Sequence, residues 1–259
     1  MDDGRQGQRV SLIVAAAASV VAWKLTALVL LARASADGGV PAVKVLLAGV
    51  GLVFVGCGLF VFWRTAAHAA PLFAAFALCA GLHWGGPLEL PPGQLRSAML
   101  FVYLLVSSLL GEALFLHFAL RFPRQTRLAS RLWLTRLLYL PTLLGVLLAV
   151  VYLAASPDGG LRSTAEGLFL LLHVASSNLF PAGALVLFIV YRLRSDVGRA
   201  ERRYVGLMIA GMLTAWLPYL IASAVGAETD PWNLFMAALP ISFAIGIRGV
   251  ERARRVDLG

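Results

Sequence analysis

The chain has 259 residues, of which 60% are hydrophobic and only 14% are charged, and its mean hydropathy is +0.83. This composition excludes an ordinary water-soluble globular protein, in which about 25% of the residues are charged. The formal net charge is +9. Because the arginines lie between apolar segments and form no separate basic domain, they indicate membrane topology and argue against nucleic acid as a partner.

Apolar segments of membrane-spanning length recur along the chain. A helix rises 1.5 Å per residue, so about 20 apolar residues cross a hydrocarbon core of roughly 30 Å. Backbone polar groups in lipid must be satisfied internally, which predicts an all-α, polytopic integral membrane protein with a single transmembrane domain over residues 1–259. The predicted helices lie near residues 10–32, 45–63, 71–88, 95–120, 137–155, 167–191, 204–225 and 232–247.

The connections between these eight helices alternate in charge. Those after the odd-numbered helices contain Gly and Pro turns with acidic residues, as in Asp37-Gly38-Gly39 and Asp230-Pro231. The opposite side carries 17 of the 22 basic residues, including those of the N-terminal and C-terminal segments. The positive-inside rule therefore predicts eight transmembrane helices with both termini in the cytoplasm.

Two ionisable residues lie inside predicted spans, where a charge is costly and often functional: Lys24 in the first helix and Glu112 in the fourth. Ser108 lies one turn before Glu112, on the same helix face. Together with polar and aromatic residues of the sixth and seventh helices, they predict a candidate ligand-binding pocket. Its members are Lys24, Ser108, Glu112, Ser177, Asn178, Thr214, Trp216 and Tyr219.

A structural interpretation of the same residues stays open. Hydroxyl and amide side chains commonly join membrane helices by hydrogen bonds, and Glu112 can neutralise Lys24 as an ion pair. Close helix packing is also predicted where glycines recur in the second and seventh helices, at Gly49, Gly51, Gly56, Gly58, Gly206 and Gly211.

Motifs for catalysis are absent from the sequence. It contains no Walker loop, no dinucleotide fingerprint, no HExxH and no nucleophile elbow, so we predict no enzymatic activity, no catalytic residue, no metal site and no cofactor. One alternative rests on the four histidines: a haem-binding protein would pair His68 with His117 and His83 with His173.

The segment from Leu114 to Pro123, followed by Leu138-Tyr139-Leu140-Pro141, resembles the HF-x-L-x-FP signature of a family of bacterial membrane sensor regions. These multi-helix regions precede the catalytic parts of certain sensor histidine kinases and PP2C-type phosphatases. Within the signature, the matching residues are His117, Phe118, Phe122 and Pro123.

Two further segments agree with the family in order and spacing. The first is 198–211, followed by Pro218, and the second is 240–247, followed by an arginine-rich C-terminal segment. The resemblance covers roughly residues 95–259. Ala200-Glu201 and Gly249-Val250-Glu251 depart from the family pattern, and the catalytic domain that follows the sensor region in the family is not found in this sequence.

The resemblance implies a sensory or signal-coupling module in the bacterial inner (plasma) membrane, passing ligand or partner binding to a cytoplasmic effector. Its partners would be membrane lipid and a protein, either that effector or a membrane subunit, and homo-oligomerisation is left open. The first alternative is a structural or accessory subunit of a larger membrane complex. The second is a transporter or the haem-binding redox protein described above.

Overall fold

The computed structural model describes residues 13–22, 24–25, 42–65, 67–84, 100–126, 128–156, 159–229 and 231–257. Within these ranges the regular secondary structure is helical and contains no β-strand. Six helices are long and apolar enough to cross a membrane: Val43–Arg64, Leu100–Arg121, Leu132–Ala154, Gly160–Leu193, Arg199–Ala224 and Pro231–Arg255. The all-α class is therefore confirmed, and these six helices are those of a membrane protein.

The first and third predicted spans contain shorter apolar helices, Ile13–Ala22 and Ala70–His83. Other parts of these predicted spans, residues 26–32 and 85–88, lie outside the described residues. By their contacts, the chain divides into two compact units: Met1–Gly86 with Arg192–Gly259, and Pro87–Tyr191.

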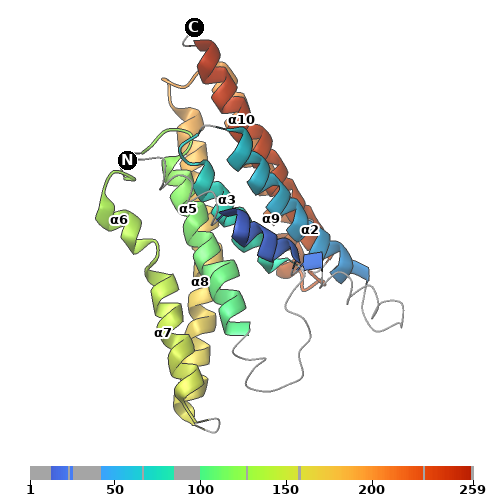
Figure 1. The fold of residues 1–259 in the computed structure, drawn as a ribbon, viewed down its shortest axis with the longest axis vertical. Coiled ribbons are helices and arrows are strands. Elements are labelled where there is room, and N and C mark those ends of the chain that lie inside the picture. The colour runs from blue at the N-terminus through green and yellow to red at the C-terminus, as the bar shows by residue number, and fades with distance from the viewer. Residues whose placement is uncertain are drawn as a thin grey trace. The chain divides into compact units, whose positions relative to one another are not determined.

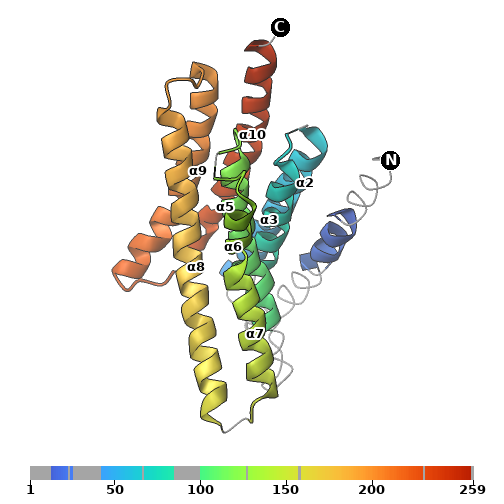
Figure 2. The same ribbon diagram turned by 90° about the vertical axis from the view of Figure 1, so that its left-hand side faces the viewer.

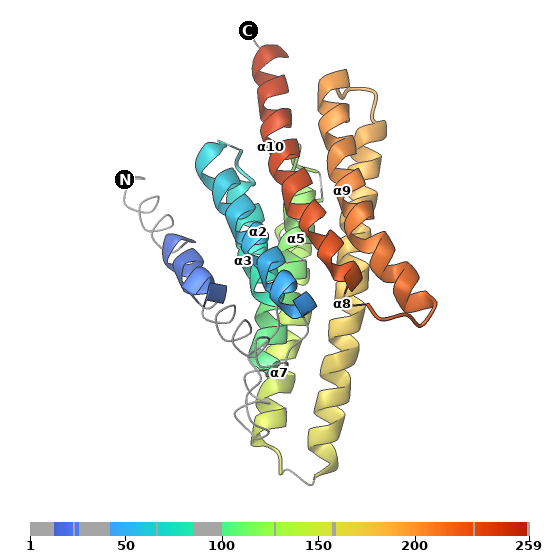
Figure 3. The ribbon, with the colours of Figure 1, turned by 90° about the vertical axis from the view of Figure 1, so that its right-hand side faces the viewer.

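The first unit contains the N-terminal and C-terminal helices. Its elements are the helix Ile13–Ala22, α2 (Ala42–Arg64), α3 (Ala70–His83), α9 (Arg199–Ala224), the 3-10 helix η2 (Pro231–Ala237) and α10 (Ala238–Asp257) (Figure 1). α2 packs against α3, and α10 packs against both α9 and α2 (Figure 3). Phe73 of α3 stacks on Phe243 of α10 with ring centroids 5.8 Å apart, so aromatic contacts join α3 to α10.

The second unit is built around the span Leu100–Arg121. Its elements are the π-helical segment η1 (Leu105–Leu110), α5 (Gly111–Arg121), α6 (Leu132–Leu137), α7 (Leu140–Ala154) and α8 (Gly160–Leu193) as far as Tyr191. α7 and α8 run in opposite directions and form a helical hairpin (Figure 2). Phe101 packs on Tyr152 of α7 and Phe169 of α8, with centroid distances of 4.3 and 4.6 Å. These three rings join the span to the hairpin.

α8 begins at Gly160 and not at residue 167 as predicted, so Arg162 and Glu166 are helical and not loop residues. Side chains stabilise the added turns: Ser163 and Thr164 donate to the Gly160 carbonyl at 2.9 and 2.8 Å, and the Arg162 guanidinium donates to the Tyr152 hydroxyl at 2.9 Å. The 34 residues of α8 measure about 51 Å at 1.5 Å per residue, well beyond a hydrocarbon core of roughly 30 Å. The apolar segment that the sequence shows is therefore shorter than the helix that contains it.

The predicted start of α9 and the predicted end of α10 also differ from those in the structure. α9 begins at Arg199, before the predicted residue 204, and α10 continues to Asp257, beyond the predicted residue 247. The arginines of these stretches, predicted in a loop and a basic tail, therefore lie on helices. An ion pair between Glu201 and Arg254 supports both extensions, as described below.

Glycines permit close helix contact at three of the six predicted positions. A Cβ added at Gly51 would lie 2.6 Å from the Gly81 carbonyl oxygen, one at Gly58 would lie 2.6 Å from the Ala77 Cβ, and one at Gly211 would lie 2.4 Å from the Ser242 Cβ. Gly49 and Gly56 have no described neighbour within 4 Å of such a Cβ, so close packing there stays a prediction. At Gly206 the neighbour is the Arg192 side chain.

Candidate functional site

A polar cluster in the second unit joins the span Leu100–Arg121 to α8. The Ser108 hydroxyl lies 2.8 Å from His173 Nδ1 and 2.9 Å from the Ser177 hydroxyl. His173 and Ser177 are four residues apart on α8, so both side chains lie on one helix face. A serine hydroxyl has one proton and two lone pairs, which allows Ser108 to bridge the two α8 side chains. We call Ser108, His173 and Ser177 the serine–histidine cluster.

Ser108 reaches this position from a π-helical segment, Leu105–Leu110, inside an otherwise α-helical span. A π-turn inserts an extra residue into the helix and changes the direction in which the following side chains point, and such turns are frequent at functional sites. Ser107 and Ser108 are both buried within it. Hydropathy predicts an unbroken α-helix here, because it contains no signal for a change of helix type.

Glu112 is the second residue after the π-helical segment and is partly buried. It makes no hydrogen bond or ion pair with another described residue. A carboxyl group in a span is costly unless it meets a polar partner, a ligand or water. Glu112 therefore stays a candidate ligand or proton site beside the serine–histidine cluster.

The remaining predicted pocket residues are distributed over both units. Asn178 is exposed on α8, and its side-chain amide donates to the Val174 carbonyl of its own helix at 2.7 Å. Thr214, Trp216 and Tyr219 lie on α9 in the first unit; Thr214 is exposed, and the two aromatic residues are partly buried. Of the eight pocket residues, Ser108 and Ser177 are thus in direct contact. The binding role of the others stays a prediction.

Lys24 is fully buried in the first unit, with 0% of its side chain exposed. Its ammonium donates to the Leu82 carbonyl at 2.9 Å and to the Trp84 carbonyl. Both carbonyls lie at the C-terminal end of α3, where backbone oxygens lack partners within the helix and the helix dipole favours a cation. Lys24 therefore caps α3, and among the described residues its ammonium is paired with these carbonyls and not with a carboxylate.

The residues of the sensor-type signature form a compact contact in the second unit. His117 Nδ1 lies 2.8 Å from the hydroxyl of Tyr139, which belongs to the second signature segment. Phe118 stacks on Phe122 with ring centroids 5.2 Å apart, and Phe122 and Pro123 are buried. α5 ends at Arg121 because Phe122 is extended, as expected for a residue before proline.

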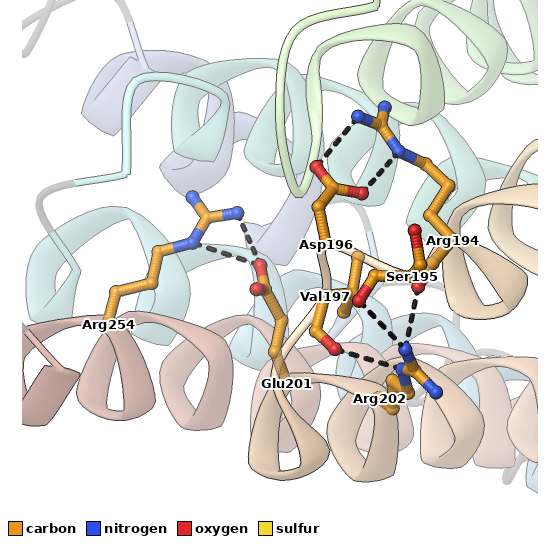
Figure 4. A network of polar contacts seen from close by, with 7 residues as sticks. All are labelled: Arg194, Ser195, Asp196, Val197, Glu201, Arg202 and Arg254. Atoms are coloured by element: carbon orange, nitrogen blue, oxygen red, sulfur yellow. Dashed lines mark hydrogen bonds and ion pairs between the residues drawn. The ribbon is translucent and has the colours of Figure 1, made fainter.

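The arginine-rich end of the first unit is held together by a buried ion pair (Figure 4). Arg254 of α10 donates from Nε at 3.0 Å and from Nη2 at 2.5 Å to one carboxylate oxygen of Glu201 on α9. Glu201 is 4% exposed, whereas about one third of the Arg254 side chain is exposed. We call this pair the α9–α10 clamp.

A second arginine shapes the turn before α9. The Arg202 guanidinium donates to the carbonyls of Val197 at 2.9 Å, Arg194 at 2.8 Å and Ser195 at 3.3 Å, as Figure 4 shows. Arg194 forms a bidentate pair with Asp196, at 3.0 and 2.9 Å, but both side chains are about half exposed. Exposed pairs contribute little to stability, so the turn is ordered mainly by Arg202.

The histidines have different surroundings. His117 and His173 belong to the second unit, whereas His68 and His83 belong to the first, where the His83 ring contacts Trp84. Among the described residues, no three His, Cys, Asp or Glu side chains are grouped to hold a metal ion. Each predicted haem pair consists of one histidine from the first unit and one from the second. Haem binding stays a prediction.

Sequence reasoning missed two features of these sites. His173 was considered only for haem, although its spacing from Ser177 places the two on one helix face. Glu201 was treated as a departure from the sensor-family pattern, although a lone acidic residue among arginines is a signal for an ion pair. No known family model matches the chain, and neither the curated proteins nor the solved structures include one that is significantly similar to it.

Proposed function

We propose that the chain is a sensory or signal-coupling module of the bacterial inner membrane, with eight transmembrane helices and both termini in the cytoplasm. The serine–histidine cluster and Glu112 would form its input site. The arginine-bearing ends of α9 and α10 would pass the change to a cytoplasmic effector.

The observation that carries this proposal is the α9–α10 clamp. Because α10 continues as a helix from Ala238 to Asp257, a displacement of its apolar part is transmitted along a rigid rod to its arginines. The Glu201–Arg254 pair couples that rod to α9. When the packing of α10 changes, the ion pair would move the arginine-bearing ends of both helices together. A cytoplasmic partner bound to these arginines would then sense the change.

The contact between His117 and Tyr139 supports the family resemblance. These residues belong to the two separate segments from which the resemblance was drawn, and they meet through a side-chain hydrogen bond.

The eight-span topology is tested by labelling single cysteines with a membrane-impermeant reagent in intact cells. In a background with Cys57→Ala and Cys79→Ala, we expect labelling from outside for Gly160→Cys and Thr229→Cys, and none for His68→Cys, Ser130→Cys or Gly198→Cys. All five should be labelled after permeabilisation. External labelling at Ser130 or Gly198 would overturn the orientation, and external labelling at His68 would overturn the spans before it.

The signalling role is tested by joining a histidine-kinase catalytic region after residue 259 and measuring autophosphorylation in membrane vesicles. Ser108→Ala removes two hydrogen bonds between helices, each worth about 0.6–2 kcal/mol, which should shift a two-state equilibrium and change autophosphorylation about fivefold in either direction. Ser163→Ala, which removes only a hydrogen bond within α8, should leave it unchanged. Equal autophosphorylation in Ser108→Ala and wild-type protein at equal expression would contradict the proposal.

A further inference from the structure

Arginines gather on one side of α9 in the first unit. Arg199, Arg203 and Gly206 follow one another at intervals of four and three residues, so they lie on the same side of the helix. The Arg192 guanidinium covers this side as well, because a Cβ added at Gly206 would lie 3.3 Å from Arg192 Nε and 3.4 Å from Arg192 Cζ. The missing side chain at Gly206 thus leaves room for the Arg192 guanidinium one helical turn from Arg203.

The charges of Arg192, Arg199 and Arg203 are not balanced by a carboxylate. All three side chains are exposed, and none has an ion pair or hydrogen bond with another described residue. The acidic residues near this end of the unit pair with other arginines; they are Asp196, Glu201 and Glu251. Like charges one turn apart on a helix repel one another, so an anion bound between them would stabilise this side of α9. Phosphate suits arginine best, because the planar guanidinium pairs with it through parallel hydrogen bonds.

The same side of α9 continues beyond Gly206 as an exposed apolar stripe. At helical spacing, the stripe comprises Ala210, Leu213, Leu217 and Ile221. The opposite side of the helix is buried within the unit, through Glu201, Met208, Met212 and Ala215. The stripe therefore faces away from the packed core of its unit, toward the surroundings of the helix.

The lengths along α9 place the arginines and the stripe at different depths of a bilayer. No charged residue follows Arg203 in α9, and the helix from Tyr204 to its end is about 30 Å long, which is the thickness of a hydrocarbon core. Arg199 and Arg203 then lie at the level of the headgroups. The apolar stripe lies at the level of the acyl chains, directly beside them on the same side of the helix.

We propose that this side of α9 binds an anionic phospholipid. Its phosphate pairs with Arg192, Arg199 and Arg203, and one acyl chain lies along the apolar stripe. The unbalanced charges select an anion, and the exposed stripe selects a lipid, because an acidic protein segment in water would contact the arginines alone. This binding does not depend on the proposed signalling role, since it concerns the retention of a lipid and not the output of the protein.

The test uses the purified full chain in detergent, titrated with phosphatidylglycerol or phosphatidylcholine and measured by native mass spectrometry. Phosphatidylglycerol should bind more tightly, because the choline cation neutralises the phosphate of the other lipid. Arg203→Gln should weaken phosphatidylglycerol binding about fivefold, and the double change Arg192→Gln with Arg203→Gln about tenfold or more. The matched control Arg64→Gln removes the charge of an exposed arginine at the end of α2 and should leave the affinity unchanged.

A change without loss of charge tests the geometry. Gly206→Leu places a side chain where the Arg192 guanidinium lies, so it should weaken phosphatidylglycerol binding as much as Arg192→Gln does. Inorganic phosphate at the concentration of the lipid should not displace it, and displacement would show that the stripe plays no part. Equal affinity for phosphatidylglycerol in wild type, Arg203→Gln and the double variant would overturn the proposal, as would equal affinity of the wild type for the two lipids. If Gly206→Leu does not fold, the changes at the exposed arginines still decide the outcome.

Discussion

Lys24→Met is expected to lower the free energy of unfolding by about 2 kcal/mol, because the Leu82 and Trp84 carbonyls lose their shared donor in a buried position. Methionine has a similar length and preserves most of the packing of the lysine stem. The loss of the ammonium also removes a desolvation cost, which is why the expected effect is smaller than the sum of two charged hydrogen bonds. Thermal unfolding in detergent measures the change.

The chain supplies a matched control, since Lys44 is its other lysine. Lys44 lies in the first turn of α2 and is only partly buried, whereas Lys24 is fully buried, so Lys44→Met should change stability less. Glu112→Gln decides whether Lys24 also needs a carboxylate. We expect the effects of Lys24→Met and Glu112→Gln to add, because the α3 carbonyls already satisfy the ammonium; a coupling energy above about 1 kcal/mol would show an ion pair instead.

Arg254→Met is expected to destabilise the first unit by about 2–3 kcal/mol and to expose the last turns of α10 to solvent. The change removes the guanidinium from Glu201, which is 4% exposed, and removal of one partner from a buried ion pair costs about 3–5 kcal/mol when both groups are buried. The partial exposure of Arg254 reduces that figure. Hydrogen exchange of the backbone amides in residues 250–257, together with thermal unfolding, measures both effects.

The neighbouring Arg255 is the control for this change. It pairs with Glu251 one turn away on the same helix, but 72% of its side chain is exposed. Arg255→Met should therefore cost less than about 0.5 kcal/mol and leave hydrogen exchange unchanged. The double change Glu201→Met with Arg254→Met removes both charges and should recover most of the stability. Equal effects of Arg254→Met and Arg255→Met would contradict a role for the clamp.

Hydropathy alone determined that the chain is helical and suited to a membrane, since a long apolar segment in lipid has few other ways to satisfy its backbone. The same pattern placed the apolar parts of the six membrane-length helices approximately, but not the ends of α8, α9 and α10. Pro123 explains why α5 ends at Arg121, because the residue before proline is driven out of the helical conformation. Close approach at Gly51, Gly58 and Gly211 was also readable, because only a residue without a side chain permits it.

The tertiary structure decided which polar side chains meet. Hydropathy assigns Lys24, Ser108 and Glu201 to particular helices or helix ends. It contains no information on how each helix is rotated about its axis, and this rotation decides which side chains meet. Lys24 therefore caps α3, Ser108 reaches His173 from a π-helical turn, and Glu201 draws the basic end of α10 onto α9. The extension of α8 and α10 beyond their apolar parts has the same origin, because polar contacts with neighbours stabilise helix turns that hydrophobic burial does not.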